Sequence, residues 1–224
     1  MIRARGLILS GSLAGDDFVP GRSDIDLLLV VEHGLQEDDV VALTAAVAEA
    51  DPSPAAGIDL HVVTAATARR PGPAPALELH VGRYPGAALE VQAEVAGDPD
   101  LCAELSMARA GGISLFGPPA ADLIGDVAPE WLHARGSFWL DRWLGLTGDV
   151  RHADFMVLTA CRIWRFRVEG THASKTAAAR WALDRDGSLS AVRQALAART
   201  GGEPTVIEED EIRRVLLAAL VTNC

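Results

Sequence analysis

Two aspartates interrupt a strongly apolar stretch of the chain, SDIDLLLVV at residues 23–31. Asp24 and Asp26 are separated by Ile25, and the aliphatic run that follows them predicts a buried β-strand. Residues i and i+2 of a strand point to the same face, so the two carboxylates lie side by side while Ile25 and Leu27 turn into the core. Carboxylates this close repel each other unless a cation lies between them, and Mg²⁺ prefers oxygen ligands of this kind. The alternative is a pair of aspartates at an exposed strand end, in contact with water.

The segment before the aspartates predicts another strand, RGLILSGS at residues 5–12, which ends in a tight turn. Gly11 lets backbone N–H groups approach a phosphate closely, and the hydroxyl of Ser12 can donate to it. Ser23 places a further hydroxyl beside the aspartate pair. A glycine-serine turn is also common in loops that bind nothing, so its weight comes from its spacing to the carboxylates.

Farther along, apolar residues at helical spacing predict a helix over 35–50, and GIDLHVVT at 57–64 predicts a third strand. That strand contains Asp59 between Ile58 and Leu60, which by itself is as readily explained as an aspartate at a strand end. A proline-rich loop follows at 69–76, and ALELHVGRY at 76–84 is either a short strand or the start of a lid.

The pattern changes near residue 98, after which apolar periodicity indicates helices separated by short glycine- and proline-containing breaks. The sequence therefore predicts an N-terminal α/β domain over 1–97, with a mixed sheet and flanking helices, and an all-α domain over 98–224, a C-terminal helical bundle. The predicted helices are 98–111, 130–147, 151–169, 174–185, 189–199 and 208–221.

The composition of the chain limits the classes of molecule that it can bind. The net charge of −11 over 224 residues argues against nucleic acid, which is bound by clustered Lys and Arg, and favours a cationic substrate. No run approaches the roughly 18 apolar residues of a membrane span. Cys102, Cys161 and Cys224 share no metal-binding spacing and indicate a reducing compartment. We expect a cytoplasmic monomer that binds no membrane.

Gly11-Ser12, the loop 13–22 and Ser23-Asp24-Ile25-Asp26 at a strand together resemble the signature of the nucleotidyltransferase superfamily that includes DNA polymerase beta. The superfamily carries a third carboxylate on a neighbouring strand, and GIDLHVV supplies Asp59. The resemblance implies that Asp24 and Asp26 bind Mg²⁺ and that Asp59 is the general base. It also implies that Gly11, Ser12 and Ser23 contact the phosphates of ATP.

The C-terminal half resembles the streptomycin and spectinomycin adenylyltransferases, which modify aminoglycosides. The similar stretches are DPDLCAELSMARAGGISLFGP at 98–118, VLTACRIWRFRVEG at 157–170 and SKTAAARWALDR at 174–185. In that family an arginine and a lysine contact the phosphates of ATP, and they correspond to Arg162 and Lys175.

The same resemblance implies acceptor-binding positions. Tyr84 stands where the streptomycin-using members carry tryptophan, and Trp143 matches a tryptophan at the end of a long helix. The acidic residue that grips streptomycin falls on His152, with Asp149 nearby. These two exchanges favour spectinomycin or another amino sugar over streptomycin. Asp59, as the base, also contacts the acceptor.

The sequence thus predicts Mg-dependent transfer of AMP from ATP to a hydroxyl of an aminoglycoside or aminocyclitol, which is an antibiotic-resistance activity. Three alternatives remain: a biosynthetic amino sugar as acceptor, an antitoxin-type nucleotidyltransferase that binds or modifies a small protein, and a nucleotide-binding protein without catalysis. The length of the chain and its C-terminal motifs argue against an antitoxin. The presence of Asp59 argues against a nucleotide-binding protein without catalysis, because binding alone does not need a general base.

Four other histidines show no metal spacing or triad context, and we expect them to be structural or exposed. They are His61, His80, His133 and His172. The other tryptophans fall in predicted helices, and we expect them to serve core or inter-domain packing. They are Trp131, Trp139, Trp164 and Trp181.

Overall fold

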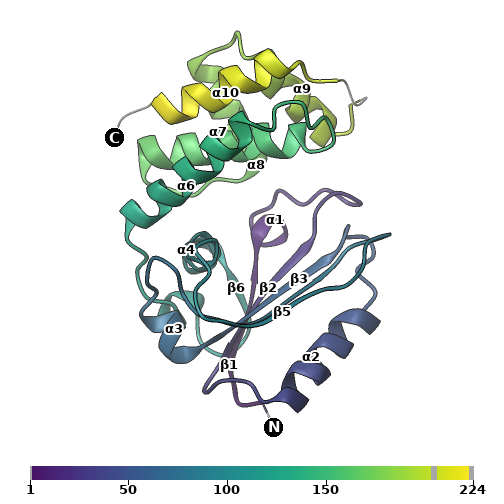
Figure 1. Cartoon of the computed structure of the whole chain (residues 1–224), viewed down its shortest axis with the longest axis vertical. Coiled ribbons are helices and arrows are strands. Elements are labelled where there is room, and N and C mark those ends of the chain that lie inside the picture. Colours follow the sequence, from purple (N-terminus) through teal and green to yellow (C-terminus); the bar gives the residue numbers. More distant parts are fainter. Residues whose placement is uncertain (1, 203–205, 222–224) are drawn as a thin grey trace. The chain divides into compact units, whose positions relative to one another are not determined.

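A computed structural model describes residues 2–202 and 206–221, and the predicted free thiol of Cys224 lies outside these residues. The chain divides into two compact units, Met1–Ala128 and Pro129–Cys224. Each is described by itself below (Figure 1). None of the helices within the described ranges is both long and apolar enough to cross a membrane.

The first unit is built on a six-stranded sheet with the order β5-β4-β3-β2-β1-β6. The neighbours β2 and β3 run parallel and the other pairs run antiparallel, so the sheet is mixed, as predicted. A parallel pair needs a crossover, which here contains α2 (Glu37–Glu49). The strands are β1 (Ala4–Ser10), β2 (Ile25–Val31), β3 (Ile58–Thr64), β4 (Leu77–Arg83), β5 (Glu90–Val95) and β6 (Ile113–Phe116).

Both faces of the sheet are partly covered by helices (Figure 1). On one face, Val47, Val40 and Leu43 of α2 pack against the aliphatic side chains of β2, β3 and β4. On the other, Leu101 and Leu105 of α4 (Leu101–Gly111) join a core that includes Ile8 of β1 and the alternate residues Leu28 and Val30 of β2. The remaining helices of this unit are the short α1 (Gly11–Ala14), α3 (Ala65–Arg69) and α5 (Ala120–Leu123).

Local sequence explains where α2 begins. The side chain of Gln36 accepts from the backbone at Asp39, and the Asp39 carboxylate accepts from the Gln36 N–H, which forms a capping box. Acidic residues fill the first turn, where the positive end of the helix dipole lies.

The structure differs from the sequence prediction in β5 and β6, which the sequence does not indicate. The pairing of β6 with β1, with Ile8 opposite Ser114, and the burial of α4 hold residues 98–128 in the first unit. The division therefore lies between 128 and 129 rather than between 97 and 98. The reason is that α4 has the same apolar periodicity as a bundle helix, and only its packing shows which core it covers.

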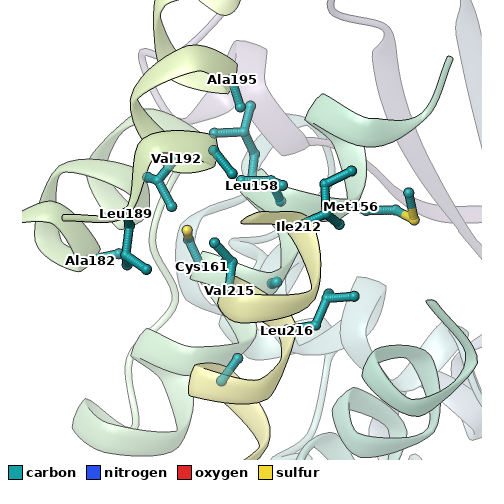
Figure 2. Close-up of a cluster of buried hydrophobic side chains, with 14 of the residues drawn as sticks. Met156, Leu158, Cys161, Ala182, Leu189, Val192, Ala195, Ile212, Val215 and Leu216 are labelled. Atoms are coloured by element: carbon teal, nitrogen blue, oxygen red, sulfur yellow. The ribbon is translucent and has the colours of Figure 1, made fainter. Parts of the chain in front are cut away.

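The second unit is helical, with α6 (Pro129–Leu144), α7 (Ala153–Glu169), α8 (Lys175–Arg185), α9 (Ser190–Arg199) and α10 (Glu209–Val221). Figure 2 shows its core, in which Met156, Leu158 and Cys161 of α7 meet Ile212 and Leu216 of α10. α7 runs through the middle of this core, which is why its burial continues along most of its length. Arg167 of α7 also donates to the carbonyls of residues 219 and 220, at 3.0 and 3.1 Å, near the end of α10.

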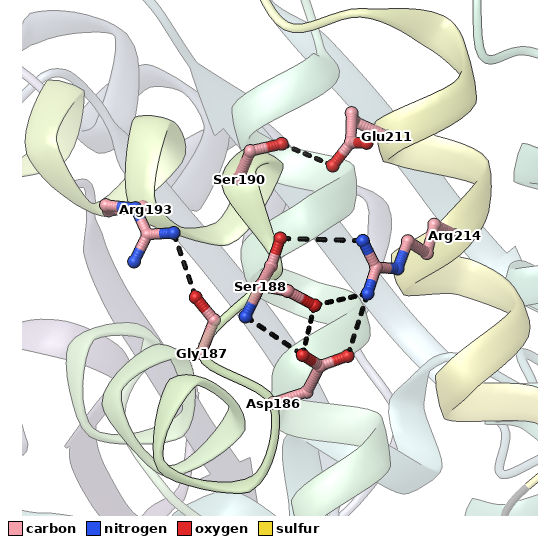
Figure 3. A network of polar contacts seen from close by, with 7 residues as sticks. All are labelled: Asp186, Gly187, Ser188, Ser190, Arg193, Glu211 and Arg214. Carbon is pink, nitrogen blue, oxygen red and sulfur yellow. Dashed lines mark hydrogen bonds and ion pairs between the residues drawn. The ribbon is translucent and has the colours of Figure 1, made fainter.

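A polar network joins the α8–α9 turn to α10 (Figure 3). Arg214 donates to a carboxylate oxygen of Asp186 at 3.1 Å, and the Ser188 N–H donates to the other Asp186 oxygen at 2.9 Å. The hydroxyl of Ser190 donates to Glu211 of α10. Hydrogen bonds from Ser188, together with the charge of Arg214, lower the pKa of Asp186. The network fixes the turn against α10.

We predict that a fragment of residues 1–128 folds on its own, whereas a fragment of residues 1–97 does not. The shorter fragment lacks β6 and α4, and each large aliphatic side chain it leaves uncovered costs about 1.5–3 kcal/mol against a total stability of about 5–15 kcal/mol. Urea unfolding followed by circular dichroism checks this. A cooperative transition in the shorter fragment would place the boundary at residue 97 after all.

Candidate active site

Three carboxylates meet where β2 and β3 begin. Asp26 and Asp59 are direct partners in the parallel β2–β3 ladder, and Asp24 lies just before β2. The Ile25 N–H donates to the Gly57 carbonyl at 2.9 Å, which joins the two segments at this point. Paired residues on neighbouring strands point to the same face at a strand spacing of about 4.8 Å. The sheet therefore presents these acidic side chains together.

Two glycines make room for the carboxylates. Gly11 has φ +64°, and a Cβ there would lie 1.8 Å from Asp26 Oδ2, which no side chain tolerates. A Cβ at Gly57 would lie 2.9 Å from Asp24 Oδ1. Position 11 therefore needs glycine for two reasons: its backbone is left-handed, and the Asp26 carboxylate leaves no space for a side chain.

The segment between β1 and β2 is closed by its own hydrogen bonds. The Asp17 N–H donates to the Ser12 carbonyl at 3.0 Å, and the Val19 N–H donates to the Ser23 hydroxyl at 3.0 Å. Ser23 is buried and its carbonyl accepts from Ala56 at 2.8 Å. Because the Ser23 hydroxyl is an acceptor here, its own proton is still available to a ligand.

Asp59 accepts hydrogen bonds on both carboxylate oxygens. His80 Nε2 lies 2.7 Å from Oδ1, and the Tyr84 hydroxyl donates to Oδ2 at 3.1 Å. Burial alone would raise the pKa of Asp59, but the hydrogen bond and charge of His80, the charge of His61 and the bond from Tyr84 outweigh it, and the pKa lies below its usual value. Burial and the nearby carboxylate raise the pKa of Tyr84. Asp59 is therefore ionised and held in place.

The two histidines beside Asp59 come from neighbouring strands, where His61 of β3 is the partner of His80 of β4. Their rings stack at 4.7 Å, and His61 Nδ1 lies 3.7 Å from Asp59 Oδ1. The hydrogen bond to Asp59 raises the pKa of His80, whereas burial lowers that of His61. The sequence predicts that both are structural or exposed; the structure instead places them against Asp59. His61, two residues after Asp59 in the same strand, carries a signal that sequence alone could have used.

Two groups of side chains offer metal-ligand atoms here, and only the first suits a cation. An all-oxygen set from Asp24 and Asp26 is the kind that Mg²⁺ prefers, and the glycine cradle around these carboxylates keeps them free of bulk. The ligand atoms of Asp59, His61 and His80 also lie within 4.8 Å of one another. A metal bound by two imidazoles lies near the plane of both rings, and stacking of these rings only 28° from parallel makes such a shared position unfavourable. This second cluster is better described by hydrogen bonds.

In the second unit, Arg162 of α7 and Lys175 of α8 are brought near each other. Arg162 Nε donates at 3.1 Å to the carbonyl of Ala173, two residues before Lys175, and burial with the charge of Arg162 lowers the pKa of His172 to about 4. The Lys175 ammonium lies 4.9 Å from the ring centre of Phe155.

The predicted acceptor residues of the second unit lie in different surroundings. Trp143 is 7% exposed and packs between Trp139 and Phe155, so its main contacts are with the core. Asp149 and His152 lie in the exposed connection between α6 and α7, where Asp149 Oδ2 is 2.7 Å from His152 Nδ1. The hydrogen bond from His152 lowers the pKa of Asp149, so the Asp149 carboxylate stays ionised.

Two family comparisons confirm the resemblance seen in the sequence. Residues 4–80 match the nucleotidyltransferase domain, and residues 142–221 match the C-terminal domain of aminoglycoside adenylyltransferases. The predicted fold class, a mixed sheet with flanking helices followed by a helical region, is confirmed as well.

Named relatives are similar over parts of their length. The chain is 34% identical over 87 residues to spectinomycin 9-adenylyltransferases of Staphylococcus aureus strains Mu50 and N315, which is 38% of this chain and only 32% of those proteins. A crystal structure of spectinomycin adenyltransferase AAD(9) from Enterococcus faecialis, with ATP and spectinomycin, superposes with a TM-score of 0.74 over 97% of this chain and 92% of that one. At 16% identity, this likeness concerns the fold.

We predict that Gly11→Ala weakens divalent metal binding by about tenfold or more, equivalent to ~1.4 kcal/mol, because the new methyl group displaces the Asp26 carboxylate. Electron paramagnetic resonance of Mn²⁺ measures this. Gly21→Ala is the matched control, since Gly21 has φ +72° but nothing within 4 Å of a Cβ. Both variants bear a backbone strain of about 1–2 kcal/mol. An equal loss of affinity in both would assign the effect to strain rather than to Asp26.

Proposed function

We propose that the chain transfers AMP from ATP to a hydroxyl of an aminoglycoside or aminocyclitol, because residues 4–80 match the nucleotidyltransferase domain and residues 142–221 match the C-terminal domain of aminoglycoside adenylyltransferases. The observation that carries the proposal is the pairing of Asp26 with Asp59 on one face of the sheet, with the Asp24 carboxylate beside Gly57 of the same edge. We further propose that the reaction takes place in the cytoplasm, that the protein acts as a monomer and that it confers antibiotic resistance.

Asp24 and Asp26 would hold Mg²⁺, as their all-oxygen donor set suggests. When bound, the ion supplies positive charge that offsets the charge of the triphosphate and of the departing pyrophosphate. Without a cation the two carboxylates repel each other, so metal binding also relieves an unfavourable interaction within this unit.

Asp59 would take the proton from the acceptor hydroxyl. The hydroxyl oxygen attacks the α-phosphorus of ATP, its proton passes to a carboxylate oxygen of Asp59, and pyrophosphate leaves with the electron pair of the broken P–O bond. The base must lie within about 2.6–3.2 Å of the hydroxyl oxygen in the reactive complex. The lowered pKa of Asp59 keeps it in the deprotonated form at neutral pH.

We propose phosphate-contacting groups for each unit by itself, as the family resemblance implies them. In the first unit, Gly11 lets the backbone approach, and Ser12 and Ser23 have hydroxyl protons to donate. In the second, Arg162 and Lys175 carry the positive charge, and the bond from Arg162 to the Ala173 carbonyl supports their placement on adjoining helices. These assignments follow the family resemblance residue by residue.

The acceptor is proposed to be cationic and closer to spectinomycin than to streptomycin. Tyr84 contacts the base and also lines a hollow of about 400 Å³ with Arg83, Pro85 and Leu89. Asp149, with its partner His152, supplies an anionic group for ammonium substituents. Trp143 would act by supporting Phe155 through an edge-to-face ring contact. The names of the staphylococcal relatives and the ligand of the superposed structure agree with this class of acceptor.

The acceptor is tested by pyrophosphate release from Mg-ATP across a panel of aminocyclitols and aminoglycosides. We expect turnover with spectinomycin and little with streptomycin. Pyrophosphate release with a biosynthetic amino sugar and with no antibiotic of the panel would indicate a role in biosynthesis rather than in resistance. A blank panel despite intact ATP binding would refute small-molecule transfer.

We predict that Asp59→Asn keeps nucleotide binding but lowers turnover about 10²–10⁴-fold, the usual contribution of a general base. Asp24→Asn should instead lose Mg-dependent binding of ATP, measured by calorimetry with a non-hydrolysable analogue. Asp122→Asn, an exposed aspartate of α5, is the control for the change of charge. Near-normal turnover of Asp59→Asn would show that another group is the base.

A further inference from the structure

The carboxylate of Asp59 is fixed from two directions by side chains of β4 and the residue after it. His80 contacts Oδ1 and Tyr84 contacts Oδ2, so neither oxygen can turn away without losing a hydrogen bond. Gly82, the ladder partner of Asp59, makes this arrangement possible. A Cβ there would lie 2.9 Å from the Tyr84 ring, so a larger residue would push the tyrosine off the carboxylate.

We propose that His80 is a positioning residue for the transfer reaction, which holds Oδ1 of Asp59 so that Oδ2 faces the acceptor hydroxyl. The inference rests on the proposed role of Asp59 as the base. An oxygen of a carboxylate has two lone pairs, and Tyr84 uses one of those on Oδ2, so the other remains for the proton of the acceptor. His80 thus acts through Asp59 and does not touch the reacting atoms.

The surroundings of His80 suit a donor to a carboxylate. An ionised carboxylate only accepts hydrogen bonds, so the contact at 2.7 Å requires a proton on Nε2. Asp59, Glu90 and Asp98 all raise the pKa of His80, which favours its charged form. His61 stacks on the ring, and burial lowers its own pKa, which disfavours a second positive charge beside His80.

The ring of His80 is also held on its flank. Its side chain is 12% exposed, and the stacked His61 ring lies parallel to it within 28°. Such contacts limit rotation of the imidazole, so the hydrogen bond to Oδ1 is offered in one direction. Preorganised supporting bonds of this kind are what a reacting group needs to keep its geometry.

The test compares His80→Ala with His80→Gln, because the amide nitrogen of glutamine can donate from nearly the same position as Nε2. We expect His80→Ala to lower kcat about 10–100-fold, with the KM for Mg-ATP and the affinity for a non-hydrolysable analogue within about twofold of wild type. His80→Gln should recover most of the loss. His33→Gln, at an exposed loop position, is the matched control.

Three outcomes overturn the proposal. If His80→Ala keeps its kcat, the hydrogen bond does not position the base. If His80→Gln is folded and as slow as His80→Ala, a donor at this place is not what the reaction needs. A zinc ion that co-purifies with the wild type, is lost in His80→Gln and is required for turnover would assign the cluster to a metal instead, and would also overturn it.

A readout independent of turnover separates this inference from the proposed function. The imidazole ¹⁵N–¹H signal of His80 in the wild type should shift in Asp59→Asn and stay unchanged in Asp122→Asn. If no acceptor is modified but this shift is present, the proposed function fails while the Asp59–His80 bond stands. If AMP is transferred but the signal does not respond, the positioning role fails alone. This measurement uses the wild type, Asp59→Asn and Asp122→Asn, so it applies even if His80→Ala does not fold.

Discussion

The parallel pairing of β2 with β3 is the interaction on which the rest of the site depends. It makes Asp26 and Asp59 ladder partners although they lie far apart in the sequence. A parallel pair requires a crossover connection, and α2 provides it while covering one face of the sheet. The carboxylates lie on the other face, at the beginning of both strands, where the aliphatic core under α4 does not reach them. Without this register the acidic side chains would belong to separate surfaces.

A group of like charges on one face is unfavourable, and the fold limits that cost with small residues and donors. Gly11 and Gly57 leave space for Asp26 and Asp24, and Gly82 leaves space for Tyr84. Asp59 is stabilised differently, by donors on both of its oxygens. The three carboxylates therefore have distinct environments, which suits the separate roles of metal ligand and base proposed for them.

The second unit is held together mainly by apolar packing of its helices. Its helices bury one continuous aliphatic core around α7, and the polar links at Arg167 and Arg214 fix the ends and turns of the helices. Its candidate ligand groups lie at the margins of that core, as charged side chains on Arg162, Lys175 and Asp149. Residues 4–80 of the first unit match the nucleotidyltransferase domain, and residues 142–221 of the second match the C-terminal domain of aminoglycoside adenylyltransferases.

The sequence by itself determined what depends on short-range periodicity. The i, i+2 spacing of Asp24 and Asp26, the glycine at position 11 and the apolar repeat of the helices in 129–221 are all properties of neighbouring residues. Tertiary structure alone decided the long-range pairings. β6 joins the first unit by pairing with β1, Trp143 is packed in a core, and His80 reaches Asp59 because β4 lies beside β3 in one particular register. Strand register is set by the summed packing of whole strands, so the residues next to His80 in the sequence do not predict its contact with Asp59.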